Sequence, residues 1–125
     1  MDEKMRKFFN DSGFTLIEIM IAIFILTVGL LGVAGVAITV INGNAFSNKI
    51  TTATALTQDK MEELRGTAYT SISDGGPETL ESIYTRTWAV TDDSPVDGMK
   101  TIEVNVKFQW KGSSRNVTLQ TMAGQ

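Results

Sequence analysis

A continuous apolar run from Phe14 to Ile41 constrains this chain more than any other feature. Its polar interruptions are Thr15, Glu18, Thr27 and Thr39, and Glu18 is the only charged one. As an α-helix the run is about 42 Å long, whereas the hydrocarbon core of a bilayer is about 30 Å thick. An ionisable group inside a membrane span costs about 2.5–3.5 kcal/mol on insertion scales. The run therefore predicts a membrane-spanning helix whose single carboxylate needs a partner.

The residue before the apolar run suggests where that partner comes from. Residues 1–13 are short, polar and mixed in charge, and they end at Gly13. A secretory signal peptide has a shorter apolar region that is followed by a small-residue cleavage site. Here the candidate processing site precedes the apolar region. Cleavage after Gly13 would free a positive amine on Phe14, which Glu18 of another copy could neutralise.

The cations on either side of the run predict its orientation. Three of them, Lys4, Arg6 and Lys7, precede it, and the next cation in the chain is Lys49. Since positive charge is retained on the cytoplasmic side, we expect the N-terminus in the cytoplasm. The remainder of the chain is then expected outside, in the periplasm if the cell is bacterial.

Three glycines within the run, Gly29, Gly32 and Gly35, recur at every third position. Small residues allow membrane helices to approach one another closely. Three glycines in place of alanine also cost about 3 kcal/mol of helix propensity. The stretch is therefore either a close-packing face, a segment able to bend or unwind when lipid is exchanged for protein neighbours, or both.

Beyond Ile41 the pattern predicts a second helical stretch and a small sheet. Asn42-Gly43-Asn44 is interpreted as a hinge or frayed turn, and a helix is expected from Ala45 to Arg65, with Gly66 after its last turn. Its apolar residues approximate one stripe, as expected for a helix that covers a sheet. These residues are Phe46, Ile50, Ala53, Leu56 and Leu64.

Three strands are predicted after a loop over residues 66–83, in which Asp74-Gly75-Gly76-Pro77 is a turn signal. They cover residues 85–91, 100–110 and 115–122, and the middle one alternates most clearly, with Ile102, Val104, Val106, Phe108 and Trp110 on one side. Short connections favour an antiparallel meander. The expected fold class is α+β: a long N-terminal helix packed on a three-stranded antiparallel sheet.

Composition excludes several kinds of function. The 125 residues contain no Cys and no His, and the formal net charge is −3. Thiolate metal sites, disulfides and the commonest general base are therefore absent. No basic stripe outside residues 1–13 favours nucleic-acid binding. We expect a protein that is not an enzyme, with no cofactor, no small-molecule substrate and no nucleic-acid partner.

Three acids in one connection are the weak candidates for a metal site. Asp92, Asp93 and Asp97 could offer oxygen ligands to a hard cation such as Ca²⁺. Their spacing does not match an EF-hand loop, and they flank Ser94-Pro95 and precede Gly98. We expect them to form a turn, with no bound metal.

The segment Gly13-Phe14-Thr15-Leu16-Ile17-Glu18 resembles the class III signal of type IV pilins and of type II secretion pseudopilins. The resemblance implies a pilin-like fold, cleavage after Gly13 by a prepilin peptidase and N-methylation of Phe14. It also gives Glu18 and Phe14 a role in subunit assembly. The chain is expected in the bacterial inner membrane as a single-pass protein and, after assembly, in a filament.

Further segments are most similar to PilV-type minor pilins: Val28-Gly29-Leu30-Leu31-Gly32, residues 55–65, Trp88-Ala89-Val90 and Val117-Thr118-Leu119. Major type IVa pilins usually carry a proline where this chain has Gly35, and they often close a C-terminal loop with a disulfide. The resemblance thus implies a minor pilin that takes part in pilus initiation and assembly. Its expected partners are the prepilin peptidase, other minor and major pilins, the inner-membrane assembly platform and membrane lipid.

Two alternatives remain open. The I-type minor pseudopilins of type II secretion share the size and the helix-plus-meander plan, and an uncleaved, membrane-anchored binding domain would require that Gly13 is never cut. The expected organisation is a leader over residues 1–13, a membrane and assembly helix over 14–41, an amphipathic continuation over 42–65 and a small periplasmic β-domain over 66–125.

Overall fold

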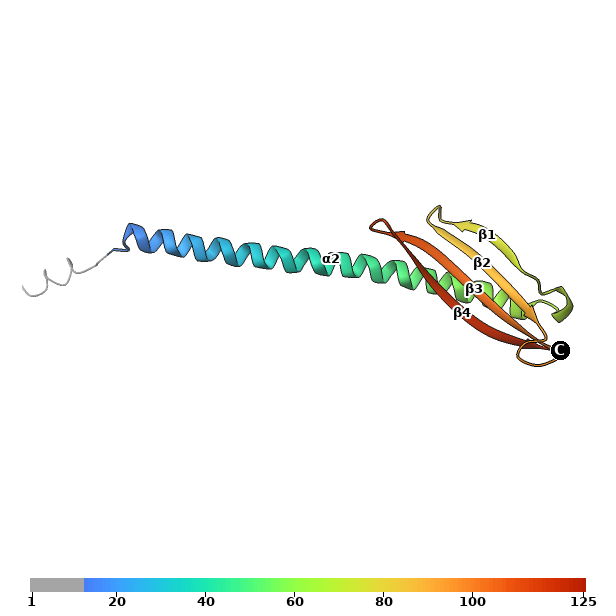
Figure 1. The fold of residues 1–125 in the computed structure, drawn as a ribbon. Helices are drawn as coiled ribbons and strands as arrows, with labels where there is room; N and C mark the ends of the chain where they lie inside the picture. The colour runs from blue at the N-terminus through green and yellow to red at the C-terminus, as the bar shows by residue number, and fades with distance from the viewer. Residues whose placement is uncertain (1–12) are drawn as a thin grey trace, which may run out of the picture. The chain divides into compact units, whose positions relative to one another are not determined.

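The structure is a computed structural model that describes residues 13–125. Its elements in chain order are α2 (Leu16–Gly66), η1 (Tyr69–Ser71), β1 (Gly75–Leu80), β2 (Tyr84–Asp92), β3 (Met99–Trp110) and β4 (Ser113–Gly124) (Figure 1). The chain forms two compact units, and the boundary between them lies between Asn42 and Gly43. Unit 1 holds the first part of α2, and unit 2 holds the rest of α2 with the strands.

In unit 1, α2 presents apolar side chains on every side. The large apolar residues from Phe14 to Ile41 are about half exposed or more, with Phe14 at 79%. A helix that is apolar all round is stable only inside a protein or a membrane. By length and composition α2 could cross a membrane, and none of its most apolar window is buried. The exposed surface therefore needs lipid or other protein chains as its surroundings.

Two threonine side chains in this part of α2 are satisfied within the helix. The Thr27 hydroxyl donates to the Ile23 carbonyl at 2.8 Å, and the Thr39 hydroxyl donates to the Gly35 carbonyl at 3.1 Å. Bonds to the carbonyl four residues earlier hide a hydroxyl from an apolar medium. The threonines therefore do not need partners from outside the helix, whereas a carboxylate does.

The interpretation of Asn42-Gly43-Asn44 as a frayed turn is wrong, because all three residues are helical within α2. The turn chemistry of Asn and Gly is a local preference. Here it is outweighed by helical neighbours on both sides, with the apolar run before and the sheet-covering stripe after.

Unit 2 confirms the predicted α+β plan. Its four strands lie in the order β1-β2-β3-β4, and each pair is antiparallel. Figure 1 shows the α2 segment of this unit running across one face of the sheet. The strands β2, β3 and β4 contain the three predicted ones. Lys111 and Gly112 connect β3 to β4, and both have the positive φ that a tight hairpin requires (47° and 79°).

The first strand, β1, corrects the prediction of a loop over residues 66–83 and of only three strands. Its Gly-Gly-Pro sequence is unusual for a strand, but β1 lies at the edge of the sheet, where proline is tolerated. Its register with β2 shifts between Gly75 and Glu78, and Gly76 has a φ of 94° there. Gly75 leaves room for the Trp88 indole, whose ring a Cβ at this position would strike. The residues that indicate a turn therefore form an irregular edge strand.

The core lies between α2 and the sheet and follows the predicted stripes. One cluster joins Met61 and Leu64 of α2 to Ile72, Ile102 and Val104. A second joins Ala53 to Tyr84, Val106 and Phe108, with Phe46, Ile50 and Leu56 packed against it. Trp88 and Trp110 are half-buried against these clusters. The alternation along β3 thus places its apolar side chains toward the helix, as predicted.

One buried cation ties the helix to the sheet. Arg86 is 5% exposed, and its Nη1 donates to the Leu56 carbonyl at 2.9 Å and contacts Asp59 Oδ2 at 3.4 Å. Its Nη2 and Nε donate to Glu78 Oε2 at 2.7 and 3.1 Å. These hydrogen bonds and the positive charge of Arg86 lower the pKa of Glu78 below its ordinary value. One guanidinium therefore links α2, β1 and β2.

Candidate assembly site

The start of α2 places Glu18 by a local cap. Thr15 immediately precedes the helix, and its Oγ1 accepts a hydrogen bond from the backbone N–H of Glu18 at 3.2 Å, while its carbonyl accepts from Ile19 N–H at 3.2 Å. A threonine followed three residues later by glutamate is the sequence of a capping box. Sequence reasoning treated Thr15 only as an interruption of the apolar run. The Thr15-x-x-Glu18 spacing was the signal that identifies it as a cap.

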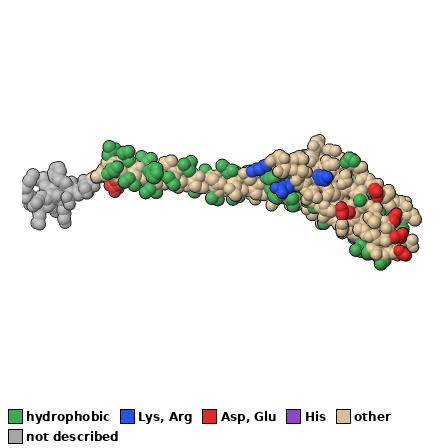
Figure 2. Space-filling model, viewed as in Figure 1, with side chains coloured by type: hydrophobic (Ala, Val, Ile, Leu, Met, Phe, Trp, Pro, Cys, Tyr) green, Lys and Arg blue, Asp and Glu red, His purple; other side chains and the backbone are tan. Residues whose placement is uncertain are grey.

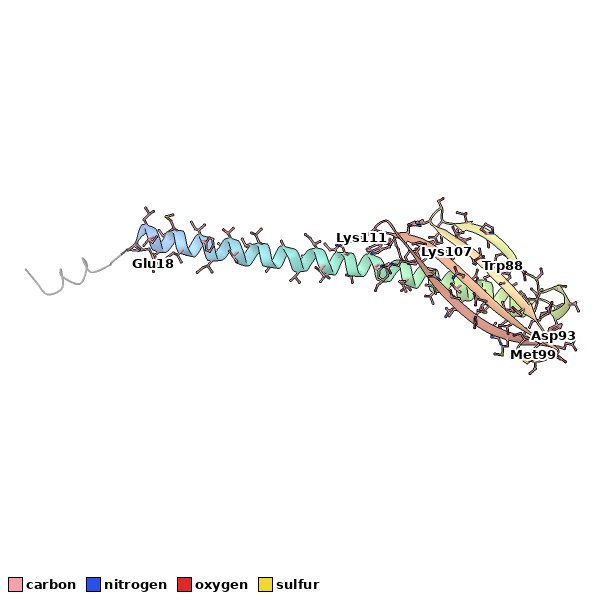
Figure 3. All side chains as sticks on the ribbon, in the orientation of Figure 1. Glu18, Trp88, Asp93, Met99, Lys107 and Lys111 are labelled. Carbon is pink, nitrogen blue, oxygen red and sulfur yellow. The ribbon has the colours of Figure 1, made fainter. Side chains whose placement is uncertain are left out.

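Glu18 stands in the first helical turn, where a carboxylate is favoured by the partial positive charge of the helix N-terminus. It is exposed, and Figure 3 places it at the start of α2, among apolar side chains. With Phe14, Ile19, Ala22 and Ile23 it lines a shallow depression on the helix. From Gly13 to Asn48 it is the only charged side chain. The depression is thus an apolar surface with one acid on it, open to a cationic group.

Phe14, one of the two predicted processing residues, lines this depression, and Gly13 directly precedes it in the chain. Gly13 is exposed, precedes the helix, and has nothing within 4 Å of where a Cβ would stand. A larger side chain would therefore meet no obstacle from residues 13–125. The rest of the predicted leader, residues 1–12, lies outside the described residues.

The three glycines of the apolar run lie within an uninterrupted stretch of α2. An added Cβ at Gly29, Gly32 or Gly35 has nothing within 4 Å. Among residues 13–125, the helix continues through these positions and no other segment packs against them. Their role in flexibility or in close packing therefore stays a prediction.

Replacing all three glycines with alanine should test that prediction. The open space at each position predicts an unstrained helix that is more stable by about 3 kcal/mol, from propensity alone. If bending or close approach is needed, we expect normal membrane levels but at least a fivefold loss of assembly, measured by immunoblotting of sheared filaments. Alanine at Gly43, in the same helix, is the control. Wild-type assembly of the triple variant would contradict both roles.

The three acids considered for a metal site do not gather around one. Asp92 Oδ1 lies 3.0 Å from Lys100 Nζ, and Asp93 Oδ1 accepts the backbone N–H of Gly98 at 3.1 Å. Within residues 13–125 no three acidic, His or Cys side chains are grouped so that they could hold a metal ion. Asp93 therefore stabilises the predicted turn, and Asp92 pairs with a cation of β3.

Residues 9–34 match the family described as the prokaryotic N-terminal methylation motif. This chain carries the N-methylation motif of prokaryotic pilin- and pseudopilin-type proteins. The matched segment contains Gly13, Phe14 and Glu18 together with the first turns of α2, and it ends before unit 2 begins. No curated protein and no solved structure matches the chain significantly. The motif and the apolar helix together indicate a membrane-anchored protein.

Proposed function

We propose that this protein is a minor pilin, a subunit of a type IV pilus that is processed by prepilin peptidase and takes part in starting or assembling the filament. The observation that carries the proposal is the methylation motif at residues 9–34, placed at the start of an exposed apolar helix with one carboxylate. The α+β architecture of unit 2 supports it, because a small sheet covered by the end of a long helix is the pilin-like plan.

The proposed mechanism is an exchange of surroundings for α2. In the membrane, lipid covers the apolar side chains of residues 14–41. After cleavage behind Gly13, Phe14 carries a free amine, and the same apolar surface packs against other subunits. Glu18 of the entering subunit then pairs with an N-terminal amine in the filament. The role of the protein is structural, and no catalytic step is assigned to it.

Two differences from major pilins support a minor role. Gly35 stands where major subunits usually have proline, and the absence of Cys excludes the usual C-terminal disulfide. A minor pseudopilin of type II secretion would share the same motif. Deletion of the gene separates the two: loss of surface fibres or twitching supports the pilus, and loss of exoenzyme export supports the pseudopilus.

Processing is tested by changing the residue before the cut. We expect Gly13→Leu to accumulate as the full-length chain, because the peptidase pocket takes only a small residue, and Gly13→Ala to be cleaved. Intact mass spectrometry of the membrane fraction should show the wild type without residues 1–13 and with one added methyl group. Since no atom of the described residues lies within 4 Å of where a Cβ at Gly13 would stand, a defect in the leucine variant would not come from misfolding of the part of the chain that the structure describes.

Full-length wild-type protein in cells with an active prepilin peptidase would contradict the proposal. That result would favour the uncleaved, membrane-anchored binding domain. Efficient cleavage of Gly13→Leu would not contradict the role as a pilus subunit. It would refute only the expectation that the peptidase requires a small residue at position 13.

A further inference from the structure

We propose that one end of unit 2 binds anionic phospholipid headgroups while the protein is in the membrane. This surface, the basic end, consists of Lys49, Lys107, Lys111 and Arg115. The inference rests on the membrane anchorage that α2 and the methylation motif indicate, and it goes beyond the assembly role proposed for Glu18.

The four cations lie at one end of unit 2 although they come from separate parts of the sequence. Lys107 and Arg115 lie close to the β3–β4 hairpin, whose turn holds Lys111. The Trp110 ring, beside that turn, lies 5.4 Å from the Phe46 ring of α2. Lys49, less than one helical turn after Phe46, has its Nζ 6.0 Å from the Tyr84 ring. The α2 segment of unit 2 and the hairpin thus bring the cations to the same end.

These cations differ from the three buried cations of unit 2 in having no acidic partner. Lys60, Arg86 and Lys100 are buried and form ion pairs with Glu63, Glu78 and Asp92. None of the four cations of the basic end forms an ion pair within residues 13–125, and three of them are exposed. One acid, Glu81, lies in the β1–β2 turn, next to the part of β2 where Thr85 pairs with Lys107. The basic end therefore keeps an excess of positive charge.

The opposite end of unit 2 has the opposite sign. It contains the β2–β3 connection and the end of α2, with Asp74, Asp93, Asp97, Glu62 and Glu63. Figure 2 shows Lys and Arg side chains at one end of this unit and Asp and Glu at the other. Figure 3 places Lys107 and Lys111 at the hairpin end and Asp93 at the other. An anionic surface would attract the first end and repel the second.

Chain continuity identifies the partner as lipid. The α2 segment of unit 2 starts at Gly43, two residues after the apolar run ends at Ile41. Lys49 follows Ile41 by eight residues, about 12 Å along a helix. Headgroups extend several ångströms beyond the hydrocarbon, and unscreened attraction reaches about 8–10 Å further. Trp110 and Phe46 add the aromatic groups that are enriched at membrane interfaces.

The test measures how close Trp110 comes to the lipid headgroups. The full-length chain carrying Trp88→Phe, so that Trp110 is its only tryptophan, is placed in nanodiscs that contain phosphatidylcholine with a headgroup nitroxide. We expect quenching of Trp110 fluorescence to rise at least twofold when about a third of the lipid is replaced by phosphatidylglycerol. The increase should disappear in 0.5 M NaCl, because salt screens exposed charges.

Matched variants show whether the increase in quenching depends on the basic end or on any positive charge of unit 2. Arg115→Gln should lose a clear part of the increase, and Lys107→Gln/Lys111→Gln/Arg115→Gln should lose nearly all of it. Arg65→Gln removes another exposed arginine, at the other end of unit 2, and should change nothing. Equal quenching in neutral and anionic discs, or equal effects of the two arginine variants, would overturn the proposal. Failure to enter any disc would instead refute the membrane anchorage itself.

Discussion

Replacing Glu18 with valine is expected to reduce incorporation into filaments at least tenfold while leaving the amount in the membrane unchanged or higher. Valine removes the only charge of the apolar helix, so membrane insertion becomes easier. In the filament, however, the amine on Phe14 of a neighbouring subunit would lose its partner. Breaking a buried ion pair by removing one member typically costs about 3–5 kcal/mol, which is more than a hundredfold in an equilibrium. Immunoblots of sheared filaments and of membranes measure both quantities.

Two further variants identify the cause of such a defect. Glu18→Gln keeps the shape and removes the charge, so it should resemble the valine variant if charge pairing is what matters. Glu62→Gln removes an exposed carboxylate from unit 2 and should assemble normally. If Glu18→Gln enters filaments normally while Glu18→Val does not, the charge of Glu18 is not required. The defect of the valine variant would then come from lost shape or lost hydrogen bonding.

The sequence was most informative where one local pattern has one physical meaning. The apolar run with Glu18 predicted an exposed apolar helix, and the alternation from Ile102 to Phe108 predicted the buried side of β3. Both rest on periodicity, which depends only on the backbone geometry of a single element. The match at residues 9–34 supports the same N-terminal segment independently of the fold.

The features that were missed depend on neighbours far along the chain. Asp74-Gly75-Gly76-Pro77 has the composition of a turn, and it becomes an edge strand only because β2 offers a partner and Trp88 fills the space beside Gly75. Local preferences carry no information about such a partner. The basic end could not be predicted for the same reason. Lys49 and Lys111 are distant in sequence and lie at one end of unit 2 only after folding.

Arg86 is the clearest case of a residue whose role only the fold reveals. It lies on the same side of β2 as Trp88 and Val90, facing α2, and a buried arginine needs acceptors. The acceptors lie 27–30 residues earlier on α2, at Asp59 and Leu56, and eight residues earlier on β1, at Glu78. Because one side chain joins three elements, its removal should affect the cooperativity of unit 2 as a whole.

Arg86→Ala is therefore expected to lower the free energy of unfolding of unit 2 by about 2–4 kcal/mol, through lost charged hydrogen bonds and lost packing of the aliphatic stem. The loss should not be larger, because the side chains of Glu78 and Asp59 are 42% and 76% exposed and return to solvent. Denaturant titration of the full chain in detergent micelles, followed by tryptophan fluorescence, reports on unit 2, which holds both tryptophans. Arg65→Ala, at an exposed arginine, should cost less than about 0.5 kcal/mol.

Acid should reduce the difference between wild type and Arg86→Ala. Arg86 lowers the pKa of Glu78 in the folded protein, so their pairing stabilises the fold above the ordinary pKa of glutamate and is lost as the pH falls through the lowered value. The variant lacks this contribution at every pH, so the two stability curves should converge on acidification. If the difference in free energy of unfolding stays constant from pH 7 to pH 3, the whole effect of Arg86 comes from packing and from its hydrogen bond to the Leu56 carbonyl. The ion pair with Glu78 would then contribute nothing to holding α2 on the sheet.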